Sequence, residues 1–119
     1  MNKSEKVKNL IIDQPLKLDC GKTIINFPLA YETYGQLNDK KDNAILAFHA
    51  LTGDQFATGI NPITKKEGWW NNALGPGKAI DTNKYFVICA NVIGGCMGSY
   101  GPSNINPENS KPFGTNFPV

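Results

Sequence analysis

The sequence contains no arginine, and its twelve basic residues are all lysines that are spread along the chain. Proteins that bind nucleic acids usually gather basic side chains on one face and use arginine for paired contacts with phosphates and bases. The net charge is only +2. We therefore expect no nucleic-acid partner.

Long apolar runs are also missing. The first twelve residues, MNKSEKVKNLII, are basic, but only three consecutive apolar residues stand before Asp13. A signal peptide needs about 7–15 apolar residues, and a membrane-spanning helix needs about 20. We therefore expect no membrane partner and a cytoplasmic location.

Cysteine and histidine are scarce. The three cysteines, Cys20, Cys89 and Cys96, form no C-x-x-C pair, and one of them would stay unpaired in any disulfide scheme. With the single histidine, His49, they offer too few ligands at a useful spacing for a zinc site. The pattern indicates a reducing compartment, and we expect neither a metal site nor a bound cofactor.

What remains is the composition of one small folded domain, with 40% hydrophobic and 18% charged residues. Residues 1–13 are charged and lack periodicity, which predicts a frayed, disordered lead-in. From Leu16 to Tyr34, alternating and β-branched residues around the tight connection 20–22 predict a β-hairpin. The polar stretch 35–43 predicts a surface turn.

Two short apolar segments, residues 43–49 (NAILAFH) and 84–90 (KYFVICA), predict strands that are buried on both faces. The glycine-rich connection of about 35 residues between them is long enough for the crossover of a parallel pair. With a hairpin in front of them, the expected sheet is mixed and the fold class is α/β. No amphipathic helix follows residue 90, so we expect the second strand to be the open edge of an unfinished sheet.

Residues 49–54 (HALTGD) follow the first predicted strand and form a candidate binding turn. A turn at the carboxyl end of a central strand directs backbone N–H groups into the crevice where α/β enzymes bind ligands. In α/β-hydrolases the corresponding loop contributes one N–H to the oxyanion hole, which stabilises the charge of the tetrahedral intermediate. A simple strand cap at His49, followed by a turn at residues 52–53, explains the same residues, and both interpretations stay open.

A possible nucleophile is harder to find. Residues 94–98 (GGCMG) fit G-x-C-x-G, but an elbow of this kind leads directly into a helix, and residues 99–104 oppose helix formation. We therefore interpret Cys96 as a chance match and an independent thiol enzyme as the weakest hypothesis. His49 is disfavoured as a catalytic base, because the histidine comes last in the hydrolase order. The chain contains no G-x-S-x-G motif.

Longer phrases of the sequence resemble homoserine O-acetyltransferases, a family of α/β-hydrolases. They are LAYETYGQLN (29–38), NAILAFHALTGD (43–54), GWWNNALGPGKAIDTNKYFVICANVIGGCMGS (68–99) and GPSNINPENSKPFGTNFPV (101–119). The resemblance runs from about Leu16 to the last residue. It implies an incomplete α/β-hydrolase core with a mixed, mostly parallel sheet, in which residues 14–119 are the family-matching part of one truncated domain.

The resemblance also implies a site. It places the oxyanion loop at residues 49–53, with the N–H of Leu51 as the first donor candidate and those of Ala50 and Thr52 as alternatives. Enzymes of the family pass an acyl group from acyl-CoA, through a serine, to the hydroxyl of homoserine in methionine biosynthesis. Acetyl-CoA and homoserine are thus the implied substrates, and homodimers are common in the family.

The sequence stops at Val119, before the serine, acid, histidine and lid of such enzymes, so the catalytic triad is absent from these residues. On its own the chain is expected to be an inactive fragment. The alternative is a non-catalytic binding module that pairs its open strand edge with a separately encoded remainder. An in-frame continuation downstream of codon 119, or a neighbouring reading frame that encodes G-x-S-x-G, would indicate a truncated or split enzyme.

Overall fold

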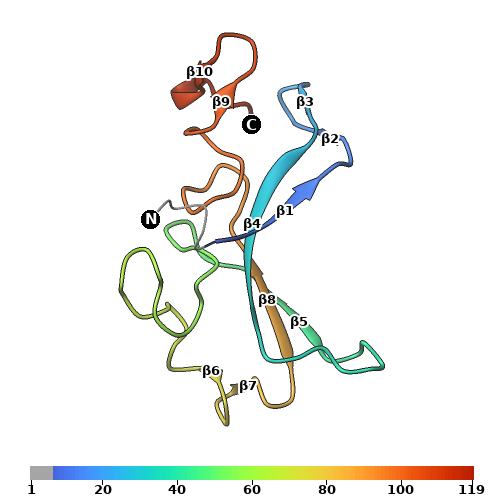
Figure 1. Ribbon diagram of the computed structural model, residues 1–119, viewed down its shortest axis with the longest axis vertical. Helices are drawn as coiled ribbons and strands as arrows, with labels where there is room; N and C mark the ends of the chain where they lie inside the picture. Colours follow the sequence, from blue (N-terminus) through green and yellow to red (C-terminus); the bar gives the residue numbers. More distant parts are fainter. Residues whose placement is uncertain (1–6) are drawn as a thin grey trace.

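A computed structural model describes residues 7–119 and shows a mixed sheet with short connecting elements and no α-helix within that range. The sheet has the strand order β1-β4-β8-β5 (Figure 1). Its strands are β1 (Lys8–Ile12), β4 (Phe27–Tyr34), β8 (Phe86–Ala90) and β5 (Ala44–Ala47). β4 pairs antiparallel with β1 and β8, whereas β5 and β8 are parallel. The predicted mixed sheet is therefore confirmed.

The first strand corrects one prediction. Residues 8–12 are not a disordered lead-in, because they pair with β4 from Lys8↔Tyr31 to Ile12↔Phe27. Most side chains of β1 are exposed, so the strand has no apolar periodicity that its sequence could reveal. Main-chain pairing with β4 defines it instead. Residues 1–6 lie outside the described part of the chain.

The predicted hairpin is present in a shorter form. β2 (Leu16–Lys17) pairs antiparallel with β3 (Thr23–Ile24). Asn26 then adopts a φ of 52°, a left-handed conformation that asparagine tolerates better than most residues. This turn separates β3 from the long strand β4, so the apolar stretch from Ile24 to Tyr34 forms two strands rather than one.

The two apolar segments form β5 and β8, which pair in parallel from Ala44↔Phe86 to Ala47↔Cys89 as predicted. Their places in the sheet differ from the prediction. β8 lies between β4 and β5, so β5 is the edge strand of the described sheet. Leu46 is 57% exposed, and the predicted burial of this strand on both faces is therefore wrong. The reason is that β5 has one neighbouring strand and no described helix over its face.

The remaining regular elements are short. At one end of the sheet a small parallel pair interrupts the long connection between β5 and β8, and at the other end a second pair and a 3₁₀ helix interrupt the C-terminal segment (Figure 1). These elements are β6 (Leu74–Gly75), β7 (Ile80–Asp81), β9 (Ile105–Asn106), β10 (Lys111–Pro112) and η2 (Gly114–Asn116). No α-helix follows residue 90 within the described chain, in agreement with the lack of an amphipathic pattern there.

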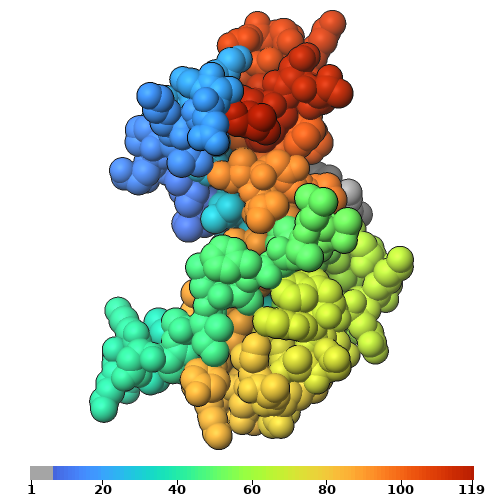
Figure 2. All heavy atoms as spheres, turned by 180° about the vertical axis from the view of Figure 1, so that it is seen from behind, coloured from blue at the N-terminus to red at the C-terminus, as the bar shows by residue number. Residues whose placement is uncertain are grey.

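The apolar core is small for the length of the chain. Its central cluster consists of Ala47, Ala57, Leu74, Val87 and Cys89. The radius of gyration is 15.8 Å, whereas a compact domain of this length has about 13.5 Å. The accessible surface is 8020 Å², compared with about 6,300 Å² for a folded monomer of this size. From behind, the N- and C-terminal segments gather in one half and the middle of the chain in the other (Figure 2).

The described residues contain no helix with the length and apolar character that crossing a bilayer requires.

Because the core is small and the edge strand β5 is open, we expect the 119-residue chain to unfold over a broad temperature range. Far-UV circular dichroism and tryptophan fluorescence during heating measure this transition. Non-coincident, shallow curves are the expected result. A steep transition with the same midpoint by both probes would contradict it.

Candidate functional site

The loop after β5 begins at the carboxyl end of that strand and turns back within four residues. The N–H of Gly53 donates to the carbonyl oxygen of Ala50 at 2.8 Å, which closes a β-turn. Neither central residue, Leu51 or Thr52, has a positive φ. The turn is therefore compatible with type I, which accepts most residue types, and not with type II.

This turn presents backbone donors that are not in use. Within residues 7–119, no hydrogen bond involves the N–H of Ala50, Leu51 or Thr52. The side chain of Leu51 is 99% exposed. Unused N–H groups at the carboxyl end of a strand can bind a negatively charged oxygen. The three predicted donors thus lie on one turn, and the choice of Leu51 among them stays a prediction.

His49 connects the turn to the loop that follows β8. Its Nε2 atom accepts a hydrogen bond from the N–H of Val92 at 3.1 Å and lies 3.3 Å from Nδ2 of Asn91. Its Nδ1 atom lies 2.7 Å from the carbonyl oxygen of Ala50. Both ring nitrogens are therefore engaged, and neither is available as a general base in this arrangement.

Gly53 allows the ring to fold back on the turn. A Cβ atom at this position would lie 3.0 Å from Cβ of His49 and 3.2 Å from the carbonyl oxygen of Ala50. These contacts are shorter than ordinary van der Waals separations, so a side chain at this position would require His49 and the turn to shift by a few tenths of an ångström.

Beyond the turn, the chain enters the core and is held there by hydrogen bonds. Gln55 is fully buried, and its Nε2 donates to the carbonyl oxygen of Met97 at 2.9 Å. The Tyr34 hydroxyl donates to the backbone oxygen of Gln55 at 3.0 Å, and the indole N–H of Trp69 donates to that of Asp54 at 2.9 Å. Burial raises the pKa of Tyr34 to about 12, so this hydroxyl keeps its proton at neutral pH.

Sequence reasoning missed two residues of this region. Asn91 is 1% exposed and Gln55 is not exposed at all, and each contacts a loop that is distant in sequence. The available signal is that a polar residue directly adjoins an apolar segment, as Asn91 does after β8. That signal is weak, because many strands end in asparagine at a turn.

The structure excludes a nucleophile elbow at Cys96. The residues that follow it, up to Asn104, form bends and turns rather than a helix. The thiol of Cys96 is exposed, whereas Cys89 is buried in the core cluster. No group of three or more His, Cys, Asp or Glu side chains within residues 7–119 is arranged to hold a metal ion.

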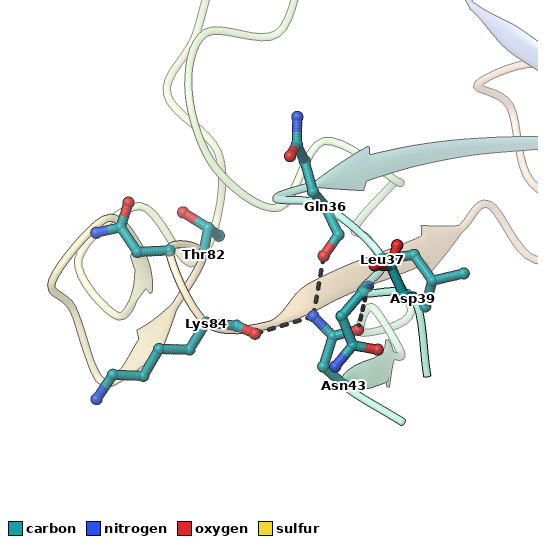
Figure 3. Close-up of a pocket in the computed structure, with 8 residues that line it drawn as sticks. Gln36, Leu37, Asp39, Asn43, Thr82 and Lys84 are labelled. Carbon is teal, nitrogen blue, oxygen red and sulfur yellow. Dashed lines mark hydrogen bonds between the residues drawn. The ribbon is translucent and has the colours of Figure 1, made fainter. Parts of the chain in front are cut away.

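A hollow lies at the end of the sheet opposite to the turn after β5, where β4 ends and β8 begins (Figure 3). Its lining is mostly polar, but the polar groups already bind one another. Nδ2 of Asn43 donates to the backbone oxygens of Gln36 and Lys84, both at 2.9 Å, and its Oδ1 accepts from the N–H of Asn38 at 3.0 Å. These bonds fasten the surface turn to β8, and we assign no ligand to the hollow.

Comparison with solved structures defines the class of the fold. The chain superimposes on a homoserine O-acetyltransferase from Bacillus anthracis with a TM-score of 0.82 and 36% identity, over 96% of this chain and 32% of that one. Esterase E22 gives a TM-score of 0.78 and 35% identity, over 95% and 33%. Together with the mixed sheet, these similarities show that the chain folds as an incomplete α/β-hydrolase core. No protein-family model matches it.

Curated relatives narrow the class. Homoserine O-acetyltransferases from Pelagibacter ubique and Nitrobacter hamburgensis are 76% identical over 119 residues and 59% identical over 107 residues. These matches cover 100% and 90% of this chain but only 32% and 27% of the relatives. A homoserine O-succinyltransferase from Halothiobacillus neapolitanus is 50% identical over 113 residues. The chain is homologous to the N-terminal portion of homoserine O-acetyltransferases and spans about a third of their length.

The rates at which the three cysteines are alkylated test whether Cys96 is an activated thiol. Burial, together with the charge of Asp54, raises the pKa of Cys89 to about 11, so its reactive thiolate is rare at pH 8. We expect iodoacetamide to label Cys20 and Cys96 at similar rates. Cys89 is expected to react more slowly than these two by a factor of about ten or more. Mass spectrometry of the labelled peptides measures this. Labelling of Cys96 far ahead of Cys20 would instead indicate an activated thiol.

Proposed function

We propose that this segment contributes an oxyanion-binding N–H to an acyltransferase that moves an acyl group from acyl-CoA to the hydroxyl of homoserine. The observation that carries the proposal is the row of unused N–H groups on the turn at the carboxyl end of β5. The names of its relatives support the substrates, and the exposure of the turn supports access by a ligand. The N–H of Leu51 is the first candidate donor, with those of Ala50 and Thr52 as alternatives.

In the proposed reaction, a serine hydroxyl outside these 119 residues attacks the thioester carbonyl of acyl-CoA. The carbonyl oxygen becomes negatively charged, and a fixed N–H dipole stabilises it more strongly than it stabilises the neutral thioester. The C–S bond breaks, and the CoA thiolate leaves and takes up a proton. The hydroxyl of homoserine then attacks the acyl-serine ester through a second oxyanion at the same place and releases the serine.

The chain contains no G-x-S-x-G serine, and an oxyanion donor without a nucleophile has no intermediate to stabilise. We therefore propose that residues 1–119 do not transfer acyl groups alone. The relatives include both acetyl- and succinyltransferases, and acetyl-CoA is the donor that more of the names given above support. Three unpaired cysteines support a reducing, cytoplasmic location.

A second candidate function is that of a complementation module, which would bind a separately encoded remainder through β5. The observation that favours it is the open edge of this strand, together with the exposure of Leu46 within it (57%) and of Phe48 just after it (77%). An edge of this kind offers unpaired main-chain groups to another strand. Mixing the chain with the separately produced C-terminal two thirds of a relative distinguishes the two candidates, since only a complementation module restores activity without a covalent link.

A chimera tests the oxyanion assignment. In it, residues 1–119 replace the matching part of the Pelagibacter ubique enzyme, which contributes the remainder. Leu51→Pro removes the candidate N–H at the second position of the turn, where a type I turn favours proline. We expect kcat, measured as CoA release with homoserine present, to fall about 10²–10³-fold.

Leu51→Ala is the matched control, because it keeps the N–H and removes only an exposed side chain. We expect its kcat to stay within about threefold of the unsubstituted chimera. Equal activities of the proline and alanine variants would show that Leu51 is not the donor. A folded chimera that releases no CoA with homoserine would contradict the proposed function itself.

A further inference from the structure

The β-turn from Ala50 to Gly53, which carries the proposed oxyanion donors, is held by a side chain from a different loop. β5 and β8 are parallel neighbours, so the loops that follow them leave the sheet at the same end. Asn91 is the first residue after β8 and is 1% exposed. Its amide nitrogen lies 3.3 Å from Nε2 of His49, although the two residues are 42 positions apart.

We propose that Asn91 is a positioning residue that holds His49 in its Nδ1–H tautomer and thereby orients the N–H of Leu51. The catalytic consequence rests on the function proposed above. The tautomer itself follows from the contacts. Two N–H donors, from Asn91 and the backbone of Val92 at 3.1 Å, meet at Nε2 of His49, so that atom must be the acceptor.

The proton of the neutral ring then lies on Nδ1, which donates to the carbonyl oxygen of Ala50 at 2.7 Å. The same oxygen accepts the N–H of Gly53 at 2.8 Å. Two donors thus fix the plane of the peptide between Ala50 and Leu51. Since the peptide is planar and trans, its C=O and the N–H of Leu51 point in opposite directions, and fixing the first fixes the second.

The orientation of the Asn91 amide is itself determined by its neighbours. Oδ1 accepts the N–H of Met97 at 3.1 Å, which leaves the NH₂ group to face His49. The backbone of Asn91 is also fixed, because its N–H donates to the oxygen of Ala30 at 2.8 Å and its oxygen accepts the hydroxyl of Ser99. An inverted amide would set donor against donor at Met97 and leave His49 with one hydrogen bond fewer.

Gly95 provides the space for this amide. A Cβ atom there would lie 2.6 Å from Nδ2 and 2.7 Å from Oδ1 of Asn91, closer than real Cβ atoms approach such groups. The loop after β8 therefore places Gly95 next to the Asn91 amide and the N–H of Met97 beside the Oδ1 atom of that amide. Both features fit a side chain whose exact direction matters, whereas a simple strand cap needs neither.

The sequence makes the tautomer directly measurable, because His49 is the only histidine of the chain. With ring-¹⁵N histidine, a long-range ¹H–¹⁵N correlation spectrum of the 119-residue chain shows which nitrogen carries the proton. The spectrum is recorded at a temperature where the strand signal in circular dichroism persists. We expect Nδ1–H in the unsubstituted chain, and the Nε2–H form, which prevails in free histidine, would overturn the proposal.

Asn91→Asp replaces the donor with an acceptor of the same size and keeps the partner of Met97. We expect Nε2 of His49 to gain a proton in this variant, because the charged carboxylate oxygen outweighs the neutral N–H of Val92, which then loses its acceptor. His49 that keeps an unprotonated Nε2 beside Asp would overturn the inferred contact. This spectrum involves no acyl transfer, so its outcome is independent of the proposed function.

The catalytic consequence is tested in the chimera described above. Asn91→Asp is expected to lower kcat about tenfold or more with little change in KM, because it acts on the transition-state donor. The double variant with Leu51→Pro is expected to be no slower than Leu51→Pro alone, since both changes remove the same interaction. Multiplied losses would overturn the positioning role. If Leu51→Pro alone is harmless, the donor assignment fails while the tautomer result stands.

Discussion

The parallel pairing of β5 with β8 is the constraint on which the site depends. Its register, which ends at Ala47↔Cys89, brings both strands to their carboxyl ends at the same level. The turn that follows β5 and the loop that follows β8 can therefore contact each other. A slip of one residue would move Val87 and Cys89 out of the core and turn the two loops away from each other. Core packing thus determines which polar groups meet.

The polar groups around Asn91 are well satisfied, whereas the buried Oε1 of Gln55 nearby has no hydrogen-bond partner among the described residues. Asn91 uses both ends of its amide and both backbone groups, and the Ser99 hydroxyl donates to Asn91 while it accepts the N–H of Ala30. A buried polar group that lost its partner would cost about 1–3 kcal/mol, so such a network resists alternative arrangements. The turn from Ala50 to Gly53 needs this support, because few apolar contacts hold it. Its central side chain, Leu51, is almost entirely exposed.

Much of this arrangement could be predicted from the sequence. Apolar runs identified β5 and β8 and their parallel pairing, and the position of residues 49–54 after a strand identified the turn. The exposure of β5 could not be predicted, because it depends on the insertion of β8 between β4 and β5. β1 was missed because pairing, rather than an apolar pattern, defines it. The contact of His49 with Asn91 was missed because only the strand register joins residues so distant in sequence.

We propose that residues 1–119 present backbone N–H donors for an oxyanion on the turn after β5 but lack the serine nucleophile that would use them. Intact-mass spectrometry of the purified chain after incubation with acetyl-CoA tests this most directly. We expect an unchanged mass, with or without homoserine, under conditions where a complete homoserine O-acetyltransferase forms product. A single acetyl adduct on one side chain, discharged when homoserine is added, would contradict it.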